Sequence, residues 1–222
     1  MSRKQLDVLF SGGAIVLAIL MLVLGYVLGD QAAFADDYVK EQLSEQKIKF
    51  ATQEELDKDE AAEANQKFAK VTEWKEGSKC LEENAGKDLT TGKQAECYGN
   101  FYIGMHMARS AANAGFEGAT YATLGATRTA LSAEVAAAKA KNDTAAADAA
   151  QKKLDSATSL RSTMQTGETL RGLLLTSYGF SIFGDKAALA ATVCYLGAAL
   201  LVILGIAGFV HAFVWSKNGK TA

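Results

Sequence analysis

Cys80 and Cys97 are the residues whose type and spacing most clearly suggest a defined chemistry. Sixteen residues lie between them. This spacing matches neither the close-set cysteine pairs of zinc sites nor the C-x-x-C of redox motifs and haem attachment. In an oxidising compartment the expected state is a disulfide, which over such a loop stabilises a fold by about 3 kcal/mol in the chain-entropy model. We predict a structural disulfide; a metal or redox role is the less favoured alternative.

The remaining candidates for chemistry do not form a set. His106 lies between Met105 and Met107, where packing or surface exposure is commoner than a role as base or ligand. The adjacent carboxylates Glu54 with Glu55 are typical of a solvated helix face. Because no combination of nucleophile, base and orienting group can be assembled, we predict no catalytic, cofactor-binding or metal-binding residues and no enzymatic activity.

Two long apolar segments must position everything else. Residues 8–29 and 187–215 are each long enough to cross about 30 Å of hydrocarbon as a helix. Basic residues flank their outer ends, Arg3 and Lys4 before the first and Lys217 and Lys220 after the second, which predicts that both termini are cytoplasmic. The predicted organisation is cytoplasmic residues 1–7, a span at 8–29, an extracytoplasmic helical domain at 30–186, a span at 187–215 and cytoplasmic residues 216–222.

Two features of the first span leave alternatives open. A cleaved signal peptide competes with an uncleaved anchor, because Ala33-Phe34-Ala35 has the form of a cleavage site, but the apolar run is longer than a signal peptide needs. Gly25 and Gly29, four residues apart, either permit close helix approach or are small residues scattered in a span. We favour the uncleaved anchor for the first question, and for the second we favour small residues scattered in the span.

The region between the spans is predicted to be all-helical. The chain has no proline and much Ala, Glu, Lys and Gln. Helical spacing covers Ala32–Phe50 as a stalk, and Ala51–Lys70 is either a solvated helix or a mobile loop. The segments Thr120–Lys141 and Thr144–Leu175, joined at Asn142-Asp143, predict an alanine-rich helical hairpin, with a mobile linker as the alternative.

Charge restricts the partners of this middle region. Leaving out Arg3, Lys4, Lys217 and Lys220 from the 23 basic residues, and Asp7 from the 25 acidic ones, gives 19 basic and 24 acidic residues. This acidic balance disfavours nucleic acid and anionic lipid as the main partner.

The segment just before the second span is predicted to join the outer domain to the membrane. Glu168 and Arg171 are three residues apart and are expected to pair on one helix face. Aromatic rings favour the headgroup region, and three of them precede the span. The predicted membrane-joint residues are Glu168, Arg171, Leu173, Leu174, Tyr178, Phe180 and Phe183.

The opening ten residues, MSRKQLDVLF, and the stretch GETLRGLLL at 167–175 with Tyr178 resemble an uncharacterised family of two-span membrane proteins from high-GC Gram-positive bacteria. Some members carry the label aromatic ring-opening dioxygenase. A two-histidine, one-carboxylate iron site needs two histidines in one pocket. Because His106 is expected outside and His211 near the cytoplasmic face, the residues do not support that label.

These observations favour a non-enzymatic integral membrane protein, a structural or accessory subunit with no cofactor. Its expected partners are the lipid bilayer and other membrane or envelope proteins or itself, and not nucleic acid. The alternative is an extracytoplasmic ligand-sensing helical bundle. With only about seven residues after Trp215, a sensor would act through a separate partner.

Overall fold

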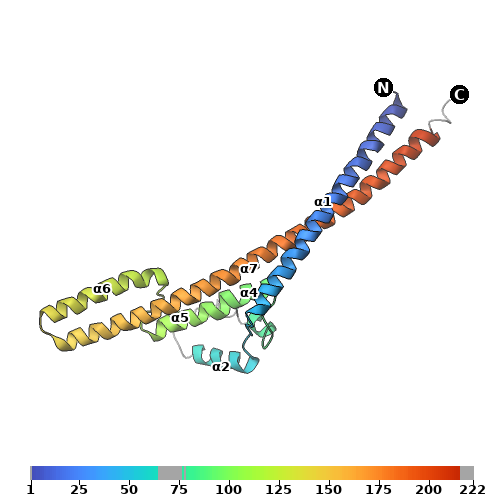
Figure 1. Cartoon of the computed structure of the whole chain (residues 1–222). Helices are drawn as coiled ribbons and strands as arrows, with labels where there is room; N and C mark the ends of the chain where they lie inside the picture. The colour runs from blue at the N-terminus through green and yellow to red at the C-terminus, as the bar shows by residue number, and fades with distance from the viewer. Residues whose placement is uncertain (1, 65–76, 78, 216–222) are drawn as a thin grey trace. The chain divides into compact units, whose positions relative to one another are not determined.

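The computed structural model describes residues 2–64, 77 and 79–215, and these are helical apart from turns and an isolated β-bridge between Lys49 and Asp88. This confirms the all-α prediction. In chain order the elements are α1 (Arg3–Glu45), α2 (Gln53–Ala64), α4 (Gly92–Cys97), the π-helix η1 (Tyr98–Ile103), α5 (Gly104–Asn113), α6 (Tyr121–Ala140), α7 (Thr144–Val210) and the π-helix η2 (His211–Trp215) (Figure 1). The predicted cytoplasmic C-terminus at 216–222 and the end of the polar segment Ala51–Lys70 lie outside the described residues.

The chain forms two compact units. Residues 1–38 and 180–222 make one, which we call the paired-helix unit, and residues 39–179 make the other, the bundle unit. α1 and α7 are long enough to contribute to both. Each unit is described separately below.

The paired-helix unit consists of α1 and α7 running antiparallel, with the first turns of α1 beside the last turns of α7 (Figure 1). Asp7 contacts His211 at one end, and Ala35 lies against Gly184 at the other. From Asp7 to Ala35 the chain covers 28 positions, and from His211 back to Gly184 it covers 27 positions. The register therefore holds over about 42 Å, at 1.5 Å per residue.

Small residues line the seam between these helices. Small residues recur every seventh position and are all buried, namely Gly184, Ala191, Ala198 and Gly205 on α7 and Ala212 on η2, and so are Ser11, Ala18 and Gly25 on α1. A Cβ on Gly25 would lie only 3.0 Å from the ring of Tyr195. Gly25 therefore serves close helix approach, which the sequence had left as the less favoured of two readings.

α1 continues as a helix through Gly29-Asp30 but ends earlier than its spacing predicted. The expected helix over Ala32–Phe50 stops at Glu45, because Lys47 adopts a left-handed conformation (φ 51°) that turns the chain. Phe50 then donates its backbone N–H to the carbonyl of Lys87 at 2.9 Å, and its side chain is buried. The apolar residues after Glu45 thus belong to the core of the bundle unit instead of to the stalk.

The bundle unit packs the start of α7 against α6 and against the continuous helical run α4, η1 and α5 (Figure 1). Its core contains apolar side chains from every one of these segments, from the end of α1 and from α2, with α4 contributing only the small residues Ala95 and Cys97. Among those buried are Leu43, Leu56, Leu81, Leu89, Met107, Leu124, Leu160, Met164 and Leu174.

The alanine-rich segment forms the predicted hairpin of α6 and α7. Thr120 caps α6, its hydroxyl accepting from the backbone N–H of Thr123 at 3.3 Å. Asn142 supplies the turn with φ 55°, and the Asp143 carboxylate caps α7 by accepting from the N–H of Ala146 at 3.0 Å. These local bonds satisfy donors that helix starts leave unpaired, which explains why two sequences with small apolar faces form a sharply bounded hairpin.

Candidate functional site

The predicted disulfide between Cys80 and Cys97 is present. It ties the short helical segment at 79–83 to the last residue of α4, with the two Cα atoms 6.1 Å apart. Leu81 and Ala95, beside the two cysteines in sequence, are almost completely buried. The bridge therefore fixes the segment before α4 onto the core of the bundle unit.

Directly after Cys97 the helix widens into η1, which stacks a row of aromatic rings. Phe50 meets Tyr98 edge to face with centroids 5.2 Å apart, Tyr98 stacks on Tyr102 at 4.6 Å, and Tyr102 lies 4.3 Å from the ring of His106. The π-helical geometry of this stretch is not apparent from the sequence. π-Helical turns are rare in α-helices and recur at functional positions.

His106 is held by its own helix. Its Nδ1 lies 2.9 Å from the carbonyl oxygen of Tyr102, and because a carbonyl only accepts, Nδ1 carries the proton. The imidazole is therefore packed on Tyr102 and oriented by it, as the sequence favoured. Among the described residues no three His, Cys, Asp or Glu side chains are grouped so as to hold a metal ion.

The surroundings raise the pKa of two phenols in this row above their ordinary value near 10, at which they are already protonated at neutral pH. Burial raises the pKa of Tyr98 to about 12, with a smaller contribution from Tyr102. The pKa of Tyr102 is raised first by burial and then by the carboxylates of Asp59 and Glu55, against an opposing effect of Arg109. Asp59 on α2 and Arg109 on α5 form an ion pair at 2.9 Å. The row therefore acts at neutral pH as a set of packed rings with α2 fastened beside it.

The predicted membrane-joint residues of the bundle unit form a polar contact with η1. Glu168 and Arg171 pair as predicted, at 3.6 Å. Arg171 also donates from Nη2 to the amide oxygen of Asn100 at 3.2 Å. Next to this contact Leu174 is completely buried, whereas Leu173 is 59% exposed. Of the two leucines, Leu174 holds α7 to the bundle core and Leu173 faces outward.

Tyr178 is fastened to α4. The ammonium group of Lys93 donates to the Tyr178 hydroxyl at 3.2 Å and lies 4.9 Å from the centre of its ring. That hydrogen bond is the main reason that the pKa of Lys93 is raised, and the neighbouring carboxylate of Glu96 adds to it. Neither Lys93 nor Asn100 is recognisable from the sequence as a partner, because both pairings join residues more than 70 positions apart.

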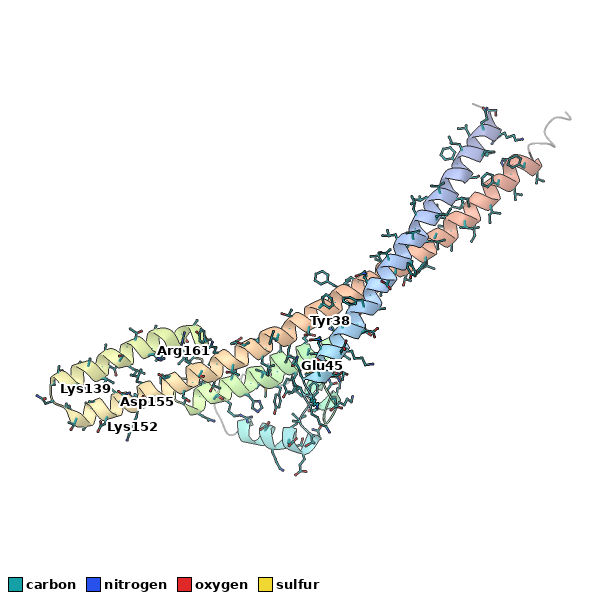
Figure 2. The ribbon with its side chains drawn as sticks, in the orientation of Figure 1. Tyr38, Glu45, Lys139, Lys152, Asp155 and Arg161 are labelled. Carbon is teal, nitrogen blue, oxygen red and sulfur yellow. A yellow bond between two sulfur atoms is a disulfide. The ribbon has the colours of Figure 1, made fainter. Side chains whose placement is uncertain are left out.

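The other two joint residues, Phe180 and Phe183, belong to the paired-helix unit. Phe180 meets Tyr38 edge to face at 5.9 Å, and Tyr38 in turn stacks on Phe34 at 5.7 Å. Figure 2 shows Tyr38 on α1. Phe183 is 76% exposed. The unit thus presents a cluster of partly exposed aromatic rings at the end opposite Asp7.

The Asp7 end of the paired-helix unit carries the charged contacts. His211 Nδ1 lies 3.0 Å from the Asp7 carboxylate, and the Lys4 ammonium lies 4.9 Å from the centre of the Phe213 ring. His211, the first residue of η2, therefore joins this end of the chain to α1. His106 and His211 belong to different units, each with its own partner.

An open groove lies between the start of α6 and α7. It encloses about 470 Å³ and is lined by Thr120, Tyr121, Ala122, Gln165, Glu168 and Thr169. The guanidinium of Arg161 covers the Tyr121 ring at 3.9 Å and so fixes that ring beside the groove. Its lining offers hydroxyl, amide and carboxylate groups but no obvious nucleophile.

Comparison with protein-family models, with curated proteins and with solved structures finds no match for this chain. The resemblance to a two-span family therefore stays a hypothesis.

Proposed function

We propose that the protein is a two-span membrane protein acting as a non-enzymatic structural or accessory subunit, with its bundle unit outside the cytoplasm. The observation that carries the membrane assignment is the outward surface of the paired-helix unit. Its large apolar side chains, among them Phe10, Leu20, Leu196 and Ile203, are 60% exposed or more. Only 17% of the most apolar window of each helix is buried, which is unlike the core helix of a water-soluble protein.

The register of the two helices strengthens this assignment. Residues 8–29 of α1 carry no charge, and with Asp7 opposite His211 they lie opposite roughly residues 190–211 of α7, which carry no Asp, Glu, Lys or Arg. Both uncharged windows extend for about 33 Å at 1.5 Å per residue, close to the roughly 30 Å of a bilayer core. Two helices whose uncharged segments lie side by side can cross the hydrocarbon core of one bilayer together.

Three features support the proposed orientation. Antiparallel spans in contact bring both chain ends to the same side of a membrane. Arg3 and Lys4 at that end favour the cytoplasm. The Cys80–Cys97 disulfide in the bundle unit is the state expected of thiols in an oxidising compartment.

The accessory role is supported by how the bundle unit uses its polar groups. Arg171 bonds Asn100, Arg109 pairs with Asp59, and the His106 ring bonds the backbone of its own helix. The two arginines fasten helices to one another, and the imidazole is held within one helical run. Such use is typical of a scaffold that presents a surface to a partner.

The test is purification of the full chain from its native membranes in mild detergent, followed by mass spectrometry of the proteins retained. We expect envelope or membrane proteins, or further copies of this chain, at constant stoichiometry. The matched control is the Leu174→Asp variant, which should be recovered without them because the bundle unit is disrupted. A lone monomer in several detergents would contradict the accessory role.

The groove at Tyr121 favours a second candidate, a ligand-sensing bundle acting through a separate partner. A ligand that binds only the folded protein raises the melting temperature. Screening the full chain in detergent against small polar metabolites should then give shifts that Gln165→Ala abolishes. Shifts of equal size in the two proteins would place binding elsewhere, and no shift with any compound would leave this candidate without support.

A further inference from the structure

In the bundle unit α7 carries an exposed face without any charge. Positions spaced alternately by three and four residues along this face are all exposed: Ser159, Ser162, Thr166, Thr169, Leu173 and Thr176. The flanking positions Thr163, Gln165, Leu170, Gly172 and Ser177 are uncharged too, although 22% of the chain is charged. A surface helix normally directs charged residues toward solvent. The opposite side of α7, with Leu160, Met164 and Leu174, is already buried in the core.

The threonine hydroxyl groups of this face are already hydrogen-bonded within α7. Thr166 donates to the carbonyl of Ser162 at 3.2 Å, Thr169 to that of Gln165 at 2.8 Å, and Thr176 to that of Gly172 at 2.8 Å. Covering these side chains therefore leaves no threonine donor unpaired, which removes the usual cost of burying a polar surface. At the centre Leu173 exposes 59% of its area to water.

We propose that this face pairs with the same face of a second copy of the chain, α7 against α7 in parallel. The inference rests on the proposed function, because two copies inserted with the same topology are necessarily parallel. Alternate spacing by three and four residues is that of a left-handed coiled coil, in which charges at the flanking positions select the partner. A foreign partner is ordinarily selected by complementary charge, whereas a self-pairing face must avoid like charges, and this one has none.

The limits of the face agree with a symmetric pairing. Asp155 is the next position of this spacing toward the start of α7, and in a symmetric pair it would face the Asp155 carboxylate of the second copy, which is repulsive. On one side the face is bordered by Arg128 of α6, which donates to Thr158 at 2.9 Å. The pairing therefore begins at Ser159. Small side chains at Ser162, Thr166 and Thr169 allow the two helices to approach closely.

The test is cysteine cross-linking of the full chain in native membranes, in a Cys194→Ala background that keeps the Cys80–Cys97 disulfide. Under mild oxidation Thr166→Cys and Leu173→Cys should give covalent dimers several-fold more than Glu168→Cys, which is exposed on another side of α7. Co-purification of tagged with untagged chains should fall several-fold for Thr166→Glu with Thr169→Glu, compared with Lys139→Glu on α6.

Equal cross-linking at all three positions, or none, would overturn the pairing, and so would cross-links from Thr166 and Leu173 to a different protein. These outcomes are separable from failure of the proposed function. A chain recovered in the soluble fraction contradicts the membrane assignment, whereas a membrane-bound chain that does not cross-link contradicts only the pairing.

Discussion

The two units use the same helix in opposite ways. In the paired-helix unit α7 buries Ala191 and Ala198 and exposes Leu196 and Ile203. In the bundle unit it buries Leu160, Met164 and Leu174 and exposes serine and threonine. Large apolar residues inside and polar residues outside are what water demands. Small residues inside and large apolar residues outside suit a surrounding lipid, where close van der Waals contact holds helices together. The contrast is the one that the proposal requires, with lipid around the paired-helix unit and water around the bundle unit.

The largest effect is expected when a charged side chain is placed in the core of the bundle unit. Leu174 is completely buried against η1, so Leu174→Asp should destabilise the bundle unit by about 4 kcal/mol or more. The adjacent Leu173→Asp is the matched control and should change stability by no more than about 0.5 kcal/mol in monomeric, detergent-solubilised protein. Denaturation monitored in detergent measures both. Equal losses would show that the two leucines are not differently buried.

The disulfide should matter only to the bundle unit. Reduction, or Cys80→Ala with Cys97→Ala, should lower the stability of this unit by about 3 kcal/mol, because the unfolded chain regains the freedom of the loop. Cys194→Ala should leave the response to reductant unchanged, since Cys194 lies in the seam of the paired-helix unit. Melting curves with and without reductant measure the difference; identical curves would contradict a structural role.

The seam of the paired-helix unit should be sensitive to size. Ala198 is 1% exposed, so Ala198→Leu should force the helices apart at a cost of about 1–3 kcal/mol. The neighbouring Ala199 is exposed, and Ala199→Leu adds the same atoms facing outward. Thermal stability of the detergent-solubilised chain should fall for the first and stay unchanged for the second. Tolerance of both would mean that the helices are not closely packed at this level.

The smallest effect is a pH dependence confined to the bundle unit. The pKa of Tyr98 is raised from its ordinary value near 10 to about 12 by burial, so between these values the folded state keeps a proton that the unfolded state has lost. Stability should therefore be full below pH 10 and fall as the pH rises toward 12. Tyr98→Phe should flatten this slope in urea titrations at pH 9 to 12. An unchanged slope would assign the loss to other groups.

The sequence predicted well the features that local chemistry determines. The absence of proline predicted the helices, and Asn142-Asp143 predicted the turn of the hairpin. The spacing of Glu168 and Arg171 predicted their ion pair. Each of these depends on residues within a few positions of one another. The disulfide followed from the spacing of the cysteines and the expected compartment.

Other features required the tertiary structure. Ile48 and Phe50 fit the helical spacing of the stalk, yet the left-handed turn at Lys47 carries them into the bundle core. The partners of Arg171 and Tyr178, namely Asn100 and Lys93, lie far away in sequence. The seven-residue repeat of small residues from Gly184 to Ala212 is a sequence pattern that indicates a close-packed seam.

Topology is the central claim, and site-specific labelling tests it most directly. Single cysteines are introduced at Ser2, before α1, and at Asp155, exposed in the bundle unit, with Cys194→Ala to remove the free thiol. A membrane-impermeant maleimide applied to intact cells should label Asp155→Cys strongly and Ser2→Cys only after the membrane is opened. The mass of the purified chain, which should retain residues before Ala35, checks that α1 is not cleaved. Labelling of Ser2→Cys in intact cells, or protection of Asp155→Cys, would contradict the account.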